Sequence, residues 1–231
     1  MTQAQILVAR AVFPEVIAKL EQHFAVDANQ ADDIWSKDQL IDKLRGKQGA
    51  FTTGGDRIDA AVLAACPDLK ICANMAVGYN NFDLAAMTQA GVLATNAPEV
   101  LTETTADFGF ALLMATARRV TESERYLRAG KWTHWSYDMF AGSDIHGSTL
   151  GILGMGRIGQ GIAKRGALGF GMKVIYHNRS RQDAALEVDC KASYVSKQEL
   201  LKLLRIALYG SILQIPILQE GMRDLARRKC K

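Results

Sequence analysis

The chain has 231 residues, 48% of them hydrophobic and 23% charged, which is an ordinary composition for a soluble globular protein. Its net charge of +4 arises from the residues after Leu203, and no basic face with interleaved aromatic side chains and no nucleic-acid motif accompanies it. We therefore expect no nucleic-acid partner, and no segment reads as long and apolar enough to cross a membrane.

The beginning of the chain is polar and lacks a secretory pattern. The four cysteines, Cys66, Cys72, Cys190 and Cys230, show no paired metal-ligand spacing. These features predict a cytoplasmic protein with reduced thiols and no metal site.

The first hundred residues alternate between strand and helix patterns. A buried strand at residues 6–9 precedes a helix from Pro14 to about residue 24, and a capping box at Ser36 opens a helix that stops at Gly46. The same reading places strands at residues 50–52, 69–73 and 92–95, with helices at residues 58–65 and before Gly91. This alternation predicts an α/β fold with a doubly wound parallel sheet.

A long helical pattern then runs from Leu101 to about Ala129. Its length sets it apart from the short alternating elements before it. We expect one long helix that links the first domain to the strand after it.

The segment from Thr149 to Gly159 combines an apolar strand, the spacing G-x-G-x-x-G and the start of a helix. In this context Gly154 permits a tight turn, Gly156 lets the backbone approach a pyrophosphate and Gly159 lets the helix pack on the strand. The amide groups at the helix start, including those of Arg157 and Ile158, would hold the phosphates. The pattern therefore predicts a dinucleotide site, and an ordinary glycine-rich turn is the alternative.

Cofactor preference depends on the end of the following strand, at residues 172–177. An acidic side chain usually binds the adenosine ribose there. This chain instead has Asn178, Arg179, Ser180 and Arg181, and guanidinium groups suit a ribose 2′-phosphate. The sequence thus favours NADP(H), with NAD(H) possible, over the alternative of a solvated basic turn.

An ordered set of motifs resembles the D-isomer-specific 2-hydroxyacid dehydrogenases, and within them the glyoxylate/hydroxypyruvate reductase branch that includes the 2-ketogluconate reductases. The resemblance extends from the first strand to about Leu201. Besides the glycine motif, it rests on residues 74–83 (NMAVGYNNFD), 91–98 (GVLATNAP), 102–107 (TETTAD), 117–119 (ARR) and 130–132 (GKW).

This resemblance implies a flavodoxin-like substrate domain at residues 1–99, without its closing C-terminal segment. It implies the first half of a Rossmann-type NAD(P)-binding domain at residues 100–202, and residues 203–231 read as a tail without family resemblance. By the same resemblance, Val77 and Gly78 offer backbone amides to a substrate carboxylate, and Thr105 lies near the nicotinamide. The implied substrate is a small 2-oxo acid, and the intact family implies a homodimer.

Family members use an Arg, a Glu and a His for hydride-coupled proton transfer, and their three motifs do not occur in this sequence. The histidines present, His23, His134, His146 and His177, lie upstream of the family's acid/base position. We therefore assign no catalytic residue and expect impaired NADPH-dependent reduction of a 2-oxo acid such as glyoxylate or hydroxypyruvate. A non-catalytic dinucleotide-binding or interaction module and a non-functional truncated product are the alternatives.

Overall fold

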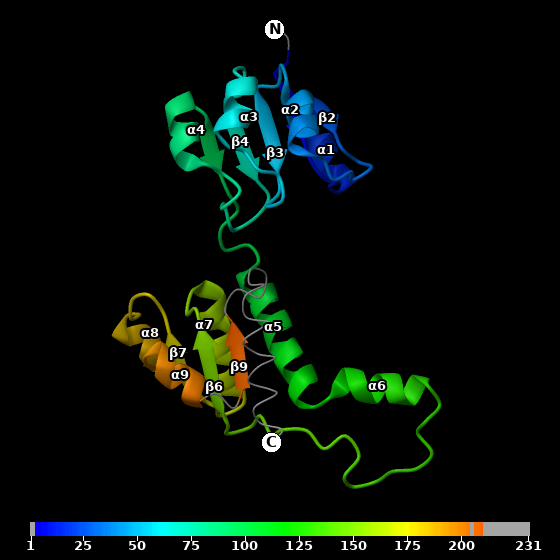
Figure 1. Cartoon of the computed structure of the whole chain (residues 1–231), viewed down its shortest axis with the longest axis vertical. Helices are drawn as coiled ribbons and strands as arrows, with labels where there is room; N and C mark the ends of the chain where they lie inside the picture. Colours follow the sequence, from blue (N-terminus) through cyan, green and yellow to red (C-terminus); the bar gives the residue numbers. More distant parts are fainter. Residues whose placement is uncertain (1–2, 204–205, 210–231) are drawn as a thin grey trace. The chain divides into compact units, whose positions relative to one another are not determined.

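The computed structural model describes residues 3–203 and 206–209, and the chain divides into two compact units, Met1–Val100 (unit 1) and Leu101–Lys231 (unit 2). Each unit contains its own parallel β-sheet (Figure 1). The predicted α/β class with parallel sheets is confirmed. The domain boundary predicted after residue 99 falls beside the division between the units.

The five strands of unit 1 pair in parallel in the order β2-β1-β3-β4-β5, which is the flavodoxin-like order. In chain order they are β1 (Gln5–Val8), β2 (Ala25–Ala28), β3 (Gly49–Thr52), β4 (Ile71–Asn74) and β5 (Leu93–Thr95). Because all strands are parallel, their carboxyl ends meet at one edge of the sheet, and the loops that follow them lie there together.

The helices of unit 1 begin and end at residues with suitable capping chemistry. They are α1 (Pro14–Glu21), α2 (Lys37–Leu44), α3 (Ala60–Ala65) and α4 (Leu84–Ala90). Ser36 and Gln39 form the predicted capping box of α2, Asp59 accepts hydrogen bonds from the first amides of α3, and Asp83 caps α4. Helix α4 ends at Gly91, which has φ +68°, a left-handed conformation that favours glycine.

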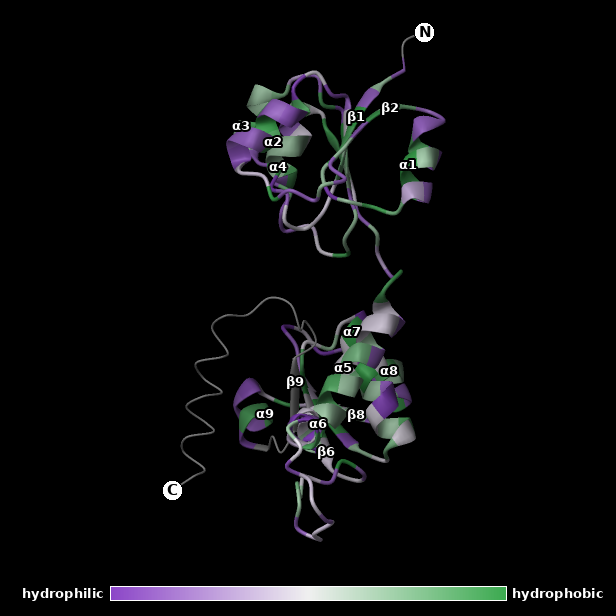
Figure 2. Ribbon diagram, turned by 90° about the vertical axis from the view of Figure 1, so that its right-hand side faces the viewer, coloured by the Kyte–Doolittle hydropathy of each residue, from purple (hydrophilic) through white to green (hydrophobic). Residues whose placement is uncertain are grey.

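The core of unit 1 lies between the sheet and α2, α3 and α4, whereas α1 lies on the other face of the sheet (Figure 2). Leu7, Ala50 and Cys72 face this core from β1, β3 and β4. They pack with buried side chains of the three helices, including Leu44 and Met87. Burial of this apolar surface holds the sheet edge, and hence its loops, in place.

The sheet of unit 2 has the strand order β8-β7-β6-β9, again all parallel. Its strands are β6 (Thr149–Leu153), β7 (Lys173–His177), β8 (Ala192–Tyr194) and β9 (Ile206–Tyr209). Its helices are α5 (Thr102–Ala117), α6 (Val120–Arg128), α7 (Arg157–Lys164), the π-helical turn η1 (Arg165–Gly169), α8 (Ala184–Asp189) and α9 (Lys197–Leu203). Leu150, Ile152, Val174 and Tyr176 form the centre of its core.

Strand β9 changes the predicted end of this domain. The sequence predicts an unrelated tail from Leu203 and a sheet that stops after its first half. In the structure β9 pairs with β6, in register from Leu150 with Ile206 to Leu153 with Tyr209. The chain therefore crosses to the other side of β6, which makes the carboxyl end of β6 a topological switch point, where ligands bind in open α/β sheets.

The prediction of a single helix from Leu101 to about Ala129 is wrong at its centre, because the helix is interrupted at Arg118 and Arg119, between α5 and α6. The N–H of Ser143 donates to the carbonyl of Ala117 at 2.9 Å, so a later segment satisfies the end of α5. Arg119 then takes φ +55°, and its guanidinium binds Glu122 in the first turn of α6. A long-range contact thus ends a helix that its local sequence would continue.

Candidate functional site

The glycine loop lies between β6 and α7, at the switch point of unit 2. Gly154 has φ +99°, a conformation that side chains other than glycine rarely adopt. A Cβ on Gly159 would lie 2.3 Å from the carbonyl oxygen of Gly154. Both glycines are therefore needed for the loop to turn back tightly against the first turn of α7.

Gly156 has a different role, because a Cβ added there would meet no protein atom within 4 Å. No side chain caps α7, and in the part of the chain that the structure describes the N–H of Gly156 has no hydrogen-bond partner. The positive end of the helix dipole lies at the same place. The loop thus offers open space and the unpaired N–H of Gly156 where a pyrophosphate would fit.

Arg157 and Ile158 form the first turn of α7. Arg157 is exposed, whereas the side chain of Ile158 packs against the core of unit 2. Ile158 can therefore offer a ligand only its backbone. Both positions remain cofactor contacts by prediction.

The loop that follows β7, residues 178–182, lies next to the glycine loop. Asn178 accepts a hydrogen bond from the N–H of Met155 through its Oδ1 at 2.9 Å, and its carbonyl oxygen accepts one from the hydroxyl of Tyr194 at 3.2 Å. The sequence predicts Asn178 as a cofactor residue, but its side-chain oxygen is used to tie the two loops together. The amide nitrogen of Asn178 is the group left for a ligand.

Arg179 and Ser180 are exposed at the tip of this loop, and within residues 3–203 neither side chain has a polar partner. Arg181 differs from the sequence expectation. Its guanidinium forms a bidentate ion pair with Glu187, with Nε to Oε1 at 2.9 Å and Nη2 to Oε2 at 2.6 Å. Arg179 is therefore the guanidinium of this loop that is available to a phosphate.

The ionisation of Glu187 follows from these contacts. Its carboxylate accepts hydrogen bonds from Arg181 and from the hydroxyl of Tyr176, and these lower its pKa from the usual value to about 2. Burial of Tyr176 and its hydrogen bond to Glu187 raise the pKa of the phenol. Glu187 is thus a carboxylate and Tyr176 a neutral donor around neutral pH.

Thr105 is half-buried in α5, and α5 is fixed against α7 by Arg165. Arg165 donates to Asp107 Oδ1 at 2.7 Å, to Glu103 Oε2 at 2.9 Å and to the carbonyl of Gly161 at 2.9 Å. These contacts hold the turn that carries Thr105 next to the helix of the glycine loop. Sequence reasoning missed Arg165, since nothing local to it indicates partners on a helix about sixty residues away.

In unit 1, the loop after β4 turns its carbonyl groups inward. The carbonyl of Ala76 accepts from the N–H of Ala97 at 3.0 Å, that of Val77 from Asn96 Nδ2 at 2.8 Å and that of Gly78 from Asn74 Nδ2 at 2.8 Å. Among the described residues, the N–H groups of Val77 and Gly78 have no partner. A Cβ on Gly78 would meet nothing within 4 Å, so the amides are accessible to a carboxylate.

Two buried polar atoms beneath this loop were not found by sequence reasoning. Thr52 and Asn74 are opposite one another at the carboxyl ends of β3 and β4. Thr52 Oγ1 and Asn74 Oδ1 are buried and have no hydrogen-bond partner in the described part of the chain. Burial of an unpaired polar atom costs free energy, and these two oxygens incur that cost at the carboxyl ends of β3 and β4.

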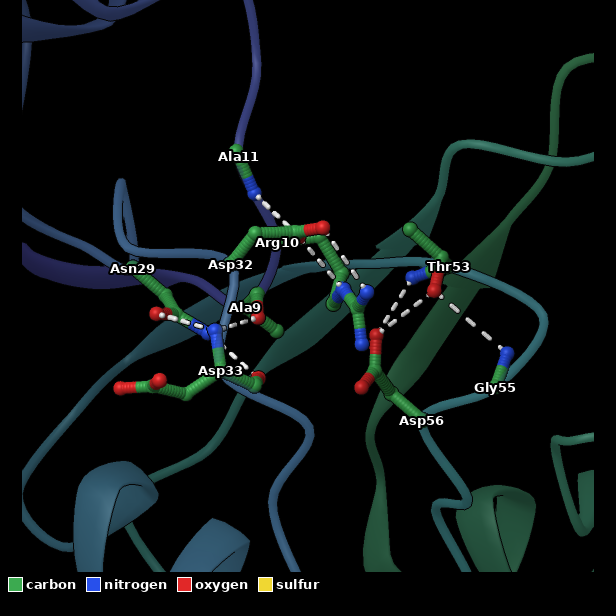
Figure 3. A network of polar contacts seen from close by, with 9 residues as sticks. All are labelled: Ala9, Arg10, Ala11, Asn29, Asp32, Asp33, Thr53, Gly55 and Asp56. Atoms are coloured by element: carbon green, nitrogen blue, oxygen red, sulfur yellow. Dashed lines mark hydrogen bonds and ion pairs between the residues drawn. The ribbon is translucent and has the colours of Figure 1, made fainter.

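The loops after β1, β2 and β3 form a polar network at the same edge of the unit 1 sheet (Figure 3). Arg10 binds both oxygens of Asp32, at 2.9 and 3.1 Å, and the N–H and hydroxyl of Thr53 donate to Asp56 at 2.8 and 3.0 Å. The hydrogen bond from the N–H of Ala11 and the Arg10 guanidinium lower the pKa of Asp32. These groups satisfy one another's hydrogen bonds, and their arrangement indicates no reaction.

The four histidines do not form a site with the residues above. His23, His134 and His146 are exposed, and His177 places its Nδ1 3.0 Å from the carbonyl oxygen of Val195. In residues 3–203 and 206–209, no group of three His, Cys, Asp or Glu side chains is arranged as a metal site requires. Over that same part of the chain, no helix has both the length and the apolar character needed to span a membrane.

A family model, curated relatives and a solved structure show which proteins this chain is similar to. The family model "D-isomer specific 2-hydroxyacid dehydrogenase, NAD binding domain" matches residues 110–209. This match includes β9, beyond the limit of about Leu201 that the sequence motifs suggest.

Curated relatives cover most of the chain. The glyoxylate reductase of Thermococcus onnurineus is 42% identical over 202 residues, which are 86% of this chain and 60% of the relative. The glyoxylate reductase of Thermococcus gammatolerans is 38% identical over 231 residues, which are 98% of this chain and 67% of the relative. The chain thus spans about 60% of the length of the first of these relatives.

A solved structure from Polaromonas sp. JS6 66, assigned to the D-isomer specific 2-hydroxyacid dehydrogenases, superposes with a TM-score of 0.82 at 33% identity. The superposition covers 94% of this chain and 67% of the other.

Proposed function

We propose a function for this chain, which belongs to the D-isomer-specific 2-hydroxyacid dehydrogenase family. Unit 2 would bind NADP(H) for the reduction of a small 2-oxo acid such as glyoxylate or hydroxypyruvate. The observation that carries this proposal is the pair of loops at the carboxyl ends of β6 and β7. Among the described residues, one offers open space and the unpaired N–H of Gly156, and the other presents the side chains of Arg179 and Ser180 without polar partners.

Each part of the cofactor has a matching group in this arrangement. The pyrophosphate would lie against Gly156 and the first amides of α7. Arg179 and Ser180 would contact the ribose 2′-phosphate, with Asn178 beside them. Thr105 would lie near the nicotinamide, which supplies the hydride chemistry when bound. NAD(H) would use the same site without the 2′-phosphate contacts.

The substrate carboxylate would bind the amides of Val77 and Gly78. In the two peptide groups that carry these amides, the carbonyls of Ala76 and Val77 accept hydrogen bonds from the N–H of Ala97 and from Asn96, and the N–H of a trans peptide points the opposite way from its carbonyl. Backbone donors held in this way stabilise an anion without reorganising when it binds. A small 2-oxo acid therefore suits this loop.

These 231 residues offer no suitable group for proton delivery to the substrate. The family's Arg, Glu and His motifs are absent from them, and the four histidines lie upstream of the family's acid/base position. General acid–base catalysis typically contributes about 10²–10⁴-fold. We therefore expect this chain on its own to bind cofactor and to reduce glyoxylate only slowly.

Association with a second copy of the chain is part of the same proposal. Helices α5 and α6 expose large apolar side chains that a monomer would leave in water. The most exposed of them are Phe108, Val120 and Leu127, at 59%, 50% and 59%. These residues are what a homodimer interface in unit 2 would bury.

Substitution of Arg179 by methionine tests the cofactor assignment. The variant keeps the length of the side chain and removes the guanidinium, so the dissociation constant for NADPH should rise roughly 10–100-fold, as expected for loss of a hydrogen bond to a charged group. The dissociation constant for NADH should stay the same, because NADH lacks the 2′-phosphate. Titration followed by nicotinamide fluorescence measures both constants.

The matched control is Arg125→Met, which removes an exposed guanidinium from α6 in the same unit. It should leave both dissociation constants unchanged. Equal NADPH binding by Arg179→Met and the native chain would contradict the placement of the 2′-phosphate at this loop.

A further inference from the structure

The loop at residues 178–182 is fixed at both of its ends and left open at its tip. At its start, Asn178 is bound by the N–H of Met155 and by the hydroxyl of Tyr194. At its end, the N–H of Gln182 donates to the hydroxyl oxygen of Tyr176 at 2.9 Å. Arg179 and Ser180 lie between these anchors.

A second set of contacts secures the end anchor. Tyr176 is fully buried in β7, and its hydroxyl donates to Glu187 Oε1 at 2.7 Å. The same carboxylate binds Arg181 with both oxygens, and the side chain of Glu187 is only 11% exposed. The carboxylate of Glu187 on α8 thus binds both Tyr176, in the strand below the loop, and Arg181, the residue that follows the tip of the loop.

The charges of this cluster compensate one another. Glu187 is paired with Arg181, so its net field at the tip of the loop is small, and salt screens it further. What Glu187 contributes to the tip is order, since a loop already held in its binding conformation loses less conformational entropy when a ligand binds.

We propose that Glu187 is a positioning residue for the 2′-phosphate subsite and that it acts through Tyr176 and Arg181 to hold Arg179 and Ser180 ready for the phosphate. This inference rests on the proposed function, in which Arg179 and Ser180 contact the 2′-phosphate of NADPH. If Glu187 acted only by charge repulsion, removal of its carboxylate would strengthen binding of the nearby phosphate. We expect the opposite, that its removal weakens phosphate binding.

The test is Glu187→Gln, titrated with NADPH and with NADH. The substitution keeps the shape of the side chain but removes its charge and one of its two acceptor oxygens, so the bidentate ion pair with Arg181 is lost. The dissociation constant for NADPH should rise about tenfold, and that for NADH should change less than about twofold. The ratio of the two constants is the decisive quantity, since a general loss of folded protein would affect both cofactors alike.

Two further variants complete the design. Tyr176→Phe removes the hydroxyl that links Glu187 to Gln182, and it should raise the NADPH constant in the same direction by a smaller factor. If Glu187→Gln does not unfold cooperatively, the NADPH and NADH constants of Tyr176→Phe are compared in its place. Glu199→Gln is the matched control and should leave the ratio unchanged, because Glu199 is a carboxylate of the same unit whose hydrogen bonds, within the described residues, are made with Ser196 at the start of α9.

Three results would overturn the inference. An unchanged or lower NADPH constant in Glu187→Gln would show that the carboxylate does not order the tip, and an equal loss of both cofactors would show that it supports only the fold. A native chain that binds NADH as tightly as NADPH would instead refute the proposed function, and the inference would fall with it.

Discussion

Gly159→Ala is expected to destabilise unit 2 and to abolish cofactor binding. Its Cβ would lie 2.3 Å from the carbonyl oxygen of Gly154, and the next nearest atom is the carbonyl carbon of the same residue at 3.3 Å. A backbone group in a tight turn cannot move aside as the end of a flexible side chain can. Overpacking typically costs about 1–3 kcal/mol, and this case belongs at or above the upper limit.

A loss of about 3 kcal/mol corresponds to a fall in melting temperature of roughly 10 °C or more for a domain of this size. Thermal unfolding followed by circular dichroism, with NADPH titration of the same sample, measures both effects. Gly169→Ala is the control, because a Cβ there meets nothing within 4 Å. A Gly159→Ala variant that melts and binds NADPH like the native chain would contradict the described loop geometry.

Gly156→Ala is expected to give the complementary result, a stable protein that binds no dinucleotide well. The added Cβ meets no protein atom within 4 Å, and the backbone at Gly156 is extended, with φ −78° and ψ −170°, which alanine adopts readily. The methyl group would therefore occupy the space assigned to the pyrophosphate. A clash of about 1–3 kcal/mol raises the dissociation constant roughly 5–150-fold.

This loss should be equal for NADPH and NADH, because both carry the pyrophosphate, and the melting temperature without cofactor should be that of the native chain. Isothermal titration calorimetry together with a melting curve separates the two quantities. Unchanged affinity in Gly156→Ala would place the pyrophosphate elsewhere.

The parts of the fold that depend on short-range patterns could be predicted from the sequence. The capping box at Ser36, the stop at Gly91 and the strand, turn and helix around Gly154 and Gly159 are set by neighbouring residues, and the structure has them where the patterns indicate. The roles of these two glycines in the turn could be anticipated because glycine is the residue that tolerates positive φ and close backbone contact.

Features that depend on distant residues could not be predicted. The break between α5 and α6 arises from the contact of Ser143 with Ala117, and β9 is recognisable only from its pairing with β6. The ion pair of Arg181 with Glu187 likewise connects a loop to the following helix. Periodicity and motif spacing contain no information on such contacts.

For the candidate site, sequence reasoning identified the segments but not the use of each side chain. Asn178 lies in the predicted loop, yet its amide oxygen binds the N–H of Met155. Arg165, which ties α5 to α7, and the buried pair Thr52 and Asn74 carry no motif. Their significance appears only when the elements are packed.

Titration of the purified chain with NADPH and with NADH, with saturating glyoxylate added to the same sample, tests the binding of NADP(H) by unit 2. We expect saturable binding with a lower dissociation constant for NADPH than for NADH, thermal stabilisation by NADPH and slow turnover of glyoxylate. A folded chain that binds neither cofactor would contradict the assignment of the glycine loop of unit 2 as a dinucleotide site.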